Sequence, residues 1–303
     1  MSGHPEVRPG REPRRTPPTE GRHPQSAGLD LLETRELVDL LVRDQSEAVA
    51  VVRAQAATLV RVVEAIVERV QRGGRVHYVG AGTSGRLGVL DASEMPPTFG
   101  TPPALVCAHI AGGDRALREA VEGAEDDGGA GERAMDAHVV PDDVVVGISA
   151  SGGAPFVIAA LERAREIGAL TVAITSSDDS ALVAAAALAI VLPTGAEVLS
   201  GSTRLKAGTA QKITLNTLST AVMVRLGKVH DNLMVDVVAT NEKLRGRAER
   251  LVRELTGAGD ARVRAALEGA AGSVKVAVVM LTRDVDAEAA RALLQTGSLR
   301  SLL

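Results

Sequence analysis

The clearest periodic pattern in the first third of the chain is helical. Between residues 46 and 72, apolar side chains recur at spacings of three or four, which places them on one face of a helix. They are Val49, Val52, Ala56, Val60, Val63, Val67 and Val70. Ser46 stands where it can cap this helix, and Gly73 follows its last turn. We predict one long amphipathic helix here.

From residue 75 onward the pattern changes to short, continuous apolar runs that alternate with helical segments. The runs are 76–79, 104–108, 144–148, 170–174 and 188–192. The helical segments are 84–90, 115–121, 155–167 and 180–186, followed by a long helix that ends near residue 227. Strands that are covered on both faces read as continuous apolar runs. The alternation therefore predicts an α/β fold with a doubly wound, five-stranded parallel sheet, in which ligands bind beyond the carboxyl ends of the strands.

The two ends of the chain differ from this central region. Six of the 13 prolines fall within the first 25 residues. Such a segment cannot bury enough apolar surface to order itself, so residues 1–18 are predicted to be a disordered tail, with disorder to about Gly21 unless a partner subunit holds it. After the main domain at 19–244, residues 245–303 are predicted to be a small helical bundle. Its helical segments are 248–255, 261–269, 274–281 and 287–294.

Composition narrows the classes of function. Lys+Arg 34 against Asp+Glu 38 gives a net charge of −4, which argues against binding to nucleic acid or to an anionic membrane. Any phosphate that is recognised is therefore expected on a small molecule. The single cysteine, Cys107, excludes an internal disulfide and a multi-cysteine metal site, and its apolar strand predicts an inert side chain. The first residues lack the apolar core of a signal peptide, so we expect a cytoplasmic protein.

Three loops at the expected ligand-binding edge are rich in glycine and hydroxyl groups. Their candidate residues are Gly82, Thr83, Ser84 and Gly85 in the first loop, Ser149 and Ser151 in the second, and Ser202 and Lys206 in the third. Glycines, hydroxyls and helix N-terminal N–H groups can coordinate a phosphate without a counter-charge. We predict one phosphate site built from all three loops. Each loop alone is also consistent with a tight turn or a capped helix start.

Two glutamates near these loops are candidates for acid–base chemistry. Glu94 lies among apolar and proline neighbours, a setting expected to raise the pKa of its carboxyl group. Glu125 ends a short acidic segment in which Glu122 would share its face of a helix, so an exposed acidic helix end is the alternative interpretation. His77 and His109, within or just after strands, are expected to be core or supporting groups.

Several long segments together carry a family resemblance. Residues 79–94 read VGAGTSGRLGVLDASE and residues 96–100 read PPTFG, and further segments lie at 110–113, 122–127, 200–212 and 232–244. In these segments the chain closely resembles the N-acetylmuramic acid 6-phosphate etherases, which belong to the sugar isomerase (SIS) superfamily of phosphosugar-binding proteins. The resemblance runs from about Thr19 to the C-terminus and leaves only the proline-rich tail outside it.

The resemblance implies a lyase without cofactor or metal that removes the lactyl ether from N-acetylmuramic acid 6-phosphate, giving N-acetylglucosamine 6-phosphate and D-lactate during cell-wall recycling. It implies that Glu125 is the base that takes the proton next to the aldehyde of the open-chain sugar. Glu94 would then be the acid that protonates lactate and later activates water. The two roles can be exchanged, because the sequence shows only that both carboxylates are present. A homodimer with sites near the subunit interface and a ubiquitin-associated fold for the C-terminal helices are also implied.

Some positions and functions stay open at this point. Gly153 and Ala154 stand where the family usually has a larger polar residue and a threonine, so phosphate binding is expected to be weaker unless Arg204 or Lys206 compensates. His230 is interpreted as structural, with a contribution across a dimer interface as the alternative. A phosphosugar-sensing regulator similar to the glucokinase regulatory protein, and an aldose–ketose isomerase of phosphosugars, are the alternative functions. The single set of loops counts against the first, and the segments around Glu94 and Glu125 count against the second.

Overall fold

A five-stranded parallel sheet forms the centre of the molecule. In the computed structural model, which describes residues 17–236 and 242–303, its strands lie in the order β2-β1-β3-β4-β5. Their bounds are β1 Val76–Gly80, β2 Val106–Ile110, β3 Val144–Ile148, β4 Leu170–Thr175 and β5 Leu188–Val191. The predicted α/β class and the five parallel strands are confirmed, with strand ends within two residues of the predicted ones.

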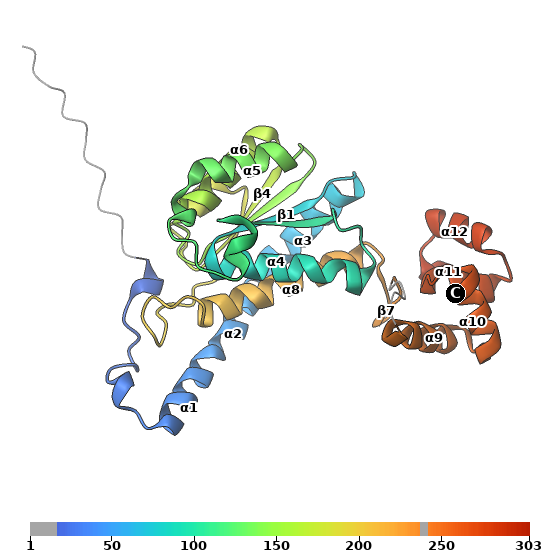
Figure 1. Cartoon of the computed structure of the whole chain (residues 1–303), viewed down its shortest axis with the longest axis horizontal. Helices are drawn as coiled ribbons and strands as arrows, with labels where there is room; N and C mark the ends of the chain where they lie inside the picture. Colours follow the sequence, from blue (N-terminus) through green and yellow to red (C-terminus); the bar gives the residue numbers. More distant parts are fainter. Residues whose placement is uncertain (1–16, 237–241) are drawn as a thin grey trace, which may run out of the picture.

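Helices cover both faces of this sheet, as Figure 1 shows. One face carries α3 (Ala56–Gln71), α4 (Gly82–Phe99) and α8 (Lys206–Arg225). The other carries α5 (Gly128–His138), α6 (Pro155–Ile167) and α7 (Ala181–Ala185). Every residue of β1 and β3 is buried between the two layers, which explains why these strands read as uninterrupted apolar runs.

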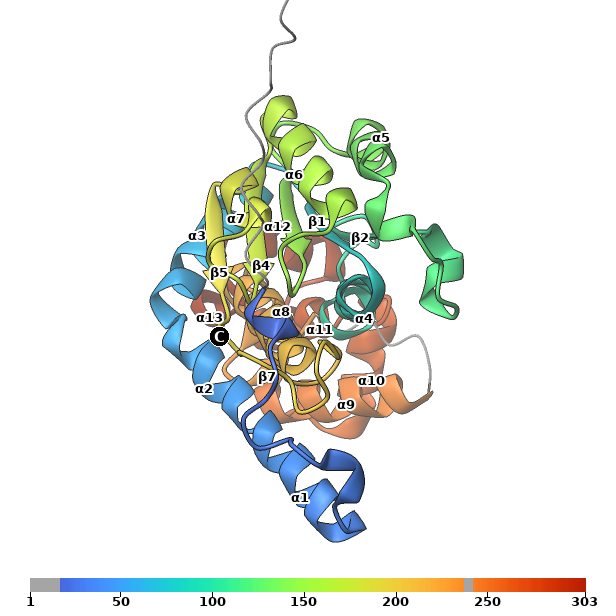
Figure 2. The same cartoon turned by 90° about the vertical axis from the view of Figure 1, so that its left-hand side faces the viewer.

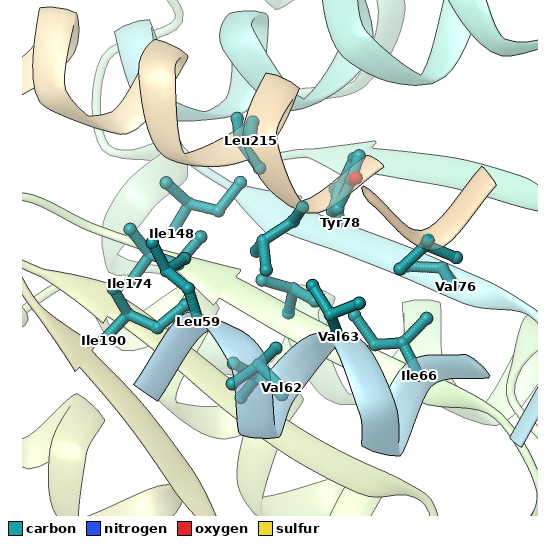
Figure 3. Close-up of a cluster of buried hydrophobic side chains, with 14 of the residues drawn as sticks. Leu59, Val62, Val63, Ile66, Val76, Tyr78, Ile148, Ile174, Ile190 and Leu215 are labelled. Carbon is teal, nitrogen blue, oxygen red and sulfur yellow. The ribbon is translucent and has the colours of Figure 1, made fainter. Parts of the chain in front are cut away.

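The core on the first face joins α3, the sheet and α8. Figure 3 shows Val62 and Ile66 of α3 and Leu215 of α8 beside Ile148 and Ile174 of the sheet. All five side chains are at most 3% exposed. Burying an aliphatic side chain of this size stabilises the folded state by about 1.5–3 kcal/mol, so this core holds α3 and α8 firmly against the sheet.

The predicted long helix before β1 is wrong in one respect, because the chain forms two helices there. α2 (Glu47–Ala54) and α3 are separated by Gln55, and the side chain of Ser46 makes no capping hydrogen bond to α2. The interruption shifts the buried face. Val49 and Val60, which the pattern placed on the apolar stripe, are 59% and 55% exposed, whereas Val62 is fully buried.

Some helices differ from the predicted ones. The helix expected at 115–121 is a 3-10 turn at Gly113–Leu117, and α5 was not predicted. Helix α4 runs to Phe99, through two prolines in its last turns. An unpredicted hairpin of β6 (Val229–His230) and β7 (Leu233–Met234) follows α8.

The N-terminal region is ordered earlier than expected. Residues 1–16, and with them most of the predicted disordered tail, lie outside the described residues. Pro18–Glu20 form a 3-10 turn, and the side chain of Thr19 is completely buried, so the expected disorder to about Gly21 does not hold for this turn. After a second 3-10 turn (Leu29–Leu31), α1 (Thr34–Gln45) and α2 extend as an arm beyond the sheet (Figure 2).

The C-terminal helices pack around a hydrophobic core of their own. They are α9 (Glu242–Thr256), α10 (Asp260–Gly269), α11 (Val274–Arg283), α12 (Ala287–Thr296) and α13 (Leu299–Leu302). Helix α9 begins three residues before the predicted boundary at residue 245. Asp236, after the β6–β7 hairpin, forms ion pairs with both Lys228 and Lys275, and Lys275 also donates to the carbonyl of Gly227. These contacts tie the C-terminal helices to the end of α8.

Three histidines form a row that begins with the buried His77 near the start of β1, continues with His109 near the end of β2 and ends with the exposed His138, the last residue of α5. His77 Nε2 lies 3.1 Å from a carboxylate oxygen of Asp143, and its Nδ1 lies 3.0 Å from His109 Nε2. The ring of His109 in turn packs against that of His138. Burial, reinforced by the neighbouring histidines and by Arg75, lowers the pKa of His109 to about 4. The sequence expectation that His77 and His109 are core or supporting groups is consistent with these contacts, which hold the two rings against each other and His77 against Asp143.

We predict that this row makes the protein sensitive to acid. The pKa of His109 is lower in the folded chain than in the unfolded one, so the unfolded state binds more protons between about pH 6.5 and 4, and stability falls as the pH falls through that window. Urea denaturation at pH 7 and pH 4.5 measures the loss. His109→Gln reduces the pH dependence of the free energy of unfolding by up to about 3 kcal/mol. The matched variant His230→Gln leaves it unchanged, and an unaltered slope in His109→Gln contradicts the assignment.

Candidate functional site

The loops after β1 and β3 form one cavity because these two strands are neighbours. Gly80, the last residue of β1, is in register with Ile148, the last residue of β3, so both chains leave the sheet side by side. The cavity between them has a volume of about 280 Å³. It is lined by Glu20, Ala81, Gly82, Thr83, Ser84, Glu125, Ile148, Ser149, Ala150, Ser151, Ala154 and Thr203. Five of the eight predicted phosphate-site residues are therefore brought together here.

The first wall is the start of α4, and glycines determine its shape. Gly82 adopts φ +52°, a left-handed conformation that favours glycine, and it lines the cavity. Gly85 does not line it. A Cβ atom on Gly85 would lie 2.7 Å from the carbonyl oxygen of Gly80 and 2.6 Å from Ile110, so this glycine lets α4 pack directly on β1. The free N–H groups of the first turn of α4 then face the cavity as an anion-binding element.

The serines of the second wall have hydroxyl protons available for a ligand. The Oγ of Ser149 accepts a hydrogen bond from the N–H of Gly152, and the Oγ of Ser151 accepts one from the N–H of Gly153. A hydroxyl that accepts from the backbone still has its own proton to donate. Ser149 and Ser151 can therefore both donate to an anion in the cavity.

Ser84 is oriented differently. Its Oγ donates to Oε1 of Gln211, 2.9 Å away, and both residues are buried. Gln211 comes from α8, so this bond joins the first turn of α4 to the helix beneath it. To donate to an anion, the Ser84 hydroxyl has to exchange this partner for the ligand.

The third loop contributes less than predicted. Thr203 lines the cavity, but Ser202, Arg204 and Lys206 do not. Lys206 is buried and forms ion pairs with Asp44 at 2.7 Å and with Glu47 at 3.2 Å. Burial lowers the pKa of Lys206, but the two carboxylates outweigh burial and raise it above its ordinary value.

The N-terminus of α8 is also occupied by the protein itself. The buried carboxylate of Glu197 accepts hydrogen bonds from the backbone N–H groups of Lys206 and Ala207, each at 2.9 Å. The next two N–H groups, of Gly208 and Thr209, donate to the carbonyls of Thr203 and Leu205, so the first turn of α8 has no free donors for a second anion. Among the residues that line the cavity there is no lysine or arginine, so neither Arg204 nor Lys206 replaces the hydroxyl that Ala154 lacks.

The two candidate carboxylates are not brought together within one chain. Glu125 lines the cavity from the 3-10 turn at Ala124–Asp126. Glu94 lies 12 positions after Gly82 in α4, about 18 Å further along the helix axis at 1.5 Å per residue. Its side chain is exposed, so the expected apolar surroundings are absent in the single chain.

A second cavity, of about 310 Å³, adjoins the first and shares Ala81, Gly82 and Glu125 with it. Arg86 and Glu122 line it. Sequence reasoning did not single out Arg86, although it follows the glycine-rich loop directly, and it also missed Glu20 and Thr203. No pattern in the local sequence marks Glu20. It reaches the cavity because the N-terminal segment folds back onto the 200–203 loop, where the Ser200 hydroxyl donates to the backbone carbonyl of Glu20.

The described residues offer little for a metal. Among residues 17–236 and 242–303, no cluster of three or more His, Cys, Asp or Glu side chains could hold an ion. Within the same residues, no helix is long and apolar enough to cross a membrane. The cavity itself presents hydroxyls, helix N–H groups and a carboxylate, which can bind a phosphorylated molecule and move a proton on it.

Two models of protein families match the chain. The model described as the glucokinase regulatory protein N-terminal SIS domain matches residues 58–165. The SIS domain model matches residues 123–221. Together the two matches span the sheet and every residue that lines the cavity except Glu20.

Whole-chain comparisons are more specific. A protein of Deinococcus radiodurans named N-acetylmuramic acid 6-phosphate etherase is 53% identical over 92% of this chain and 91% of its own length. One of the same name from Symbiobacterium thermophilum is 52% identical over 88% of this chain and 89% of its own. Among solved structures, a phosphoheptose isomerase from Francisella tularensis is similar with a TM-score of 0.53 and 18% identity, and covers 64% of this chain and 100% of that one. Because only 18% of the residues are identical, the similarity to the phosphoheptose isomerase shows a shared fold and nothing about activity.

We predict that Lys206 stabilises the fold rather than holding a ligand. Lys206→Met leaves the buried carboxylate of Asp44 without its ammonium partner, which destabilises the protein by about 3–5 kcal/mol. Urea denaturation of this variant is compared with that of Lys212→Met, which removes an exposed lysine from the same helix and changes stability by less than about 0.5 kcal/mol. Equal stability of the two variants is the outcome that contradicts this role.

Proposed function

The chain belongs to the family of N-acetylmuramic acid 6-phosphate etherases, and we propose that the cavity beside Glu125 is where it cleaves the lactyl ether of this sugar phosphate. The products are N-acetylglucosamine 6-phosphate and D-lactate, which places the enzyme in peptidoglycan recycling. The observation that carries the assignment is identity of about half of all residues with etherases over nearly the full length of both chains.

The residues of the cavity suit an elimination followed by a hydration. In the open-chain sugar, the C2 proton is acidic because it lies next to the aldehyde, and the lactyl ether is on C3. Glu125 takes the C2 proton, the C3–O bond breaks, and the electron pair of the C2–H bond becomes the C2–C3 double bond. Lactate leaves with a proton from the second carboxyl group. Water then adds to C3 and a proton returns to C2, which gives the product.

The phosphate is bound where donors converge. Ser149 and Ser151 each have a hydroxyl proton to donate, and the first turn of α4 supplies N–H groups and its positive dipole end. Gly82, Thr83 and Ser84 line the same wall. We call this phosphate-binding site the phosphate seat. It is formed by the first two predicted loops and Thr203 of the third, without Lys206. Gly85 supports it by packing, and Ser202 has no place in it.

The second carboxyl group, Glu94, acts in the site of a second copy of the chain. It is exposed and about 18 Å along α4 from its own cavity. Leu90, one turn earlier on the same face of α4, is 50% exposed, and Val38 and Val42 of the α1–α2 arm are 53% and 66% exposed. Apolar side chains of this size on a helix face favour contact with another subunit. A homodimer with its sites near the interface accounts for these exposures and supplies Glu94 to the partner's cavity.

Further parts of the proposal concern the whole protein. We infer a cytoplasmic enzyme that needs no cofactor or metal, since two carboxyl groups suffice for the reaction. We also infer that the catalytic unit extends from residue 19 to about residue 244, that the helices to residue 303 form a separate unit of the ubiquitin-associated type, and that His230 is structural. Gly153 and Ala154 are expected to weaken the phosphate seat, because nothing that lines the cavity replaces the missing hydroxyl.

The alternative functions are less well supported. A regulatory protein is suggested by one family match, but that match covers residues 58–165 only, whereas the etherases match over most of the chain. An isomerase is suggested by fold similarity at 18% identity, which does not carry an activity.

The two carboxyl groups are separable by experiment. Glu125→Gln removes the base and abolishes exchange of the C2 proton of N-acetylglucosamine 6-phosphate with deuterated water. Glu94→Gln keeps this exchange but loses D-lactate release from the substrate. Proton NMR follows the exchange, and a D-lactate assay follows the elimination. The control Glu132→Gln, an exposed glutamate of α5, leaves both unchanged.

The opposite pattern, with exchange lost in Glu94→Gln and kept in Glu125→Gln, would show that the two roles are exchanged. Near wild-type D-lactate release in both variants contradicts the two-carboxylate mechanism. Absence of D-lactate release by the wild-type protein contradicts the assigned reaction itself.

A further inference from the structure

Arg86 is the one cationic side chain among the described residues that line the second cavity, and no carboxylate of these residues is paired with it. Arg86 lies in the first turns of α4 and lines this cavity together with Glu125, which it shares with the phosphate cavity. Most of the other lining residues are small and apolar, such as Ala111 and Ala116. The cavity therefore continues from the phosphate seat past the proposed base into a pocket whose only positive charge is a guanidinium group.

Contacts with the backbone hold this guanidinium group in place. Its Nε donates to the carbonyl oxygen of Leu117 at 3.3 Å, and one terminal nitrogen donates to that of Glu119 at 3.1 Å. These bonds fix one edge of the group and leave further N–H donors, since a guanidinium has five. Among the described residues, no carboxylate lies within 4.0 Å of Arg86, although three glutamates line the same cavity. Arg86 is thus a partly buried, oriented and unpaired cation.

The substrate carries two different anionic groups, a phosphate and a carboxylate. The two cavities offer different donors: hydroxyl and N–H groups in the first, and a guanidinium group in the second. Its phosphate, on C6, is matched by the hydroxyls and N–H groups of the first cavity. Its second anion is the carboxylate of the lactyl group on C3, close to the C2 proton that Glu125 removes. A planar carboxylate is the group that arginine binds best, through two parallel hydrogen bonds. On the basis of the proposed function, we propose that Arg86 binds the carboxylate of the lactyl group and so positions the leaving group beside Glu125.

This contact also overcomes a repulsion. Glu119, Glu122 and Glu125 all line the second cavity, and their charges disfavour entry of another carboxylate. Arg86 supplies the compensating charge at one place only, which selects a sugar with a carboxylate on C3. The product N-acetylglucosamine 6-phosphate lacks this carboxylate, so Arg86 discriminates between substrate and product without contributing to phosphate binding.

Calorimetry with the full-length chain tests this proposal. In a Glu125→Gln background, which binds substrate without turnover, Arg86→Met weakens binding of N-acetylmuramic acid 6-phosphate by about 10- to 100-fold, because a charge-assisted contact is lost. Binding of N-acetylglucosamine 6-phosphate changes by less than about twofold. Arg86→Lys keeps the charge but loses the paired geometry, and gives a smaller loss for the same ligand only. Arg118→Met, which removes an exposed arginine from the adjacent segment, leaves both affinities unchanged.

The outcomes separate this proposal from the ones on which it rests. Equal weakening of both ligands in Arg86→Met and Arg86→Lys overturns it, because Arg86 then only supports the turn at residues 113–119. Unchanged affinity for both ligands also overturns it. Ser151→Ala is expected to weaken both ligands, because both carry the phosphate, and its failure to do so contradicts the phosphate seat instead. The assigned reaction is tested independently by D-lactate release from the wild-type protein.

Discussion

The parallel pairing of β1 with β3 is the constraint on which the site depends. The two strands end in register, at Gly80 and Ile148, although 68 positions separate them along the chain. Each is buried on both faces, so a shift in register would disrupt the packing against both helix layers and is disfavoured. The loops that follow are therefore held side by side, and the first turn of α4 is brought to within packing distance of β1 by Gly85.

The pairing of these two strands determines which groups line the cavity and why Glu94 is not among them. The hydroxyls of Ser149 and Ser151 accept hydrogen bonds from their own loop and can donate to a ligand, while Glu125 lines both this cavity and the one that contains Arg86. A substrate can thus lie across Glu125 with an anion at each end. The same helix α4 whose first turn lines the cavity carries Glu94 away from it, which is why we propose that the second carboxyl group comes from another copy of the chain.

The sequence predicted the sheet well because strands buried on both faces have an unmistakable apolar pattern, and five of the eight residues predicted for a phosphate site line one cavity. It predicted poorly where long-range contacts decide. The break at Gln55 and the turn at Gly113–Leu117 are not visible in periodicity. Lys206 looked like a ligand of phosphate, yet Asp44, 162 positions earlier, is its partner. Glu20 reaches the cavity because the N-terminal segment folds back onto the 200–203 loop, and no local pattern marks it. Arg86 directly follows the glycine-rich loop, but its place in the second cavity depends on the 111–125 segment that supplies most of the other lining residues.

The central claim is that one active site takes Glu125 from one subunit and Glu94 from the other. Mixing inactive Glu94→Gln and Glu125→Gln proteins under conditions of subunit exchange tests it most directly. Half of the randomly formed dimers are mixed, and each mixed dimer contains one site with both glutamates, so D-lactate release recovers to about a quarter of the wild-type rate. If mixed dimers form, as native mass spectrometry can verify, and D-lactate release stays at the level of the separate variants, both glutamates act within one chain and the claim is wrong.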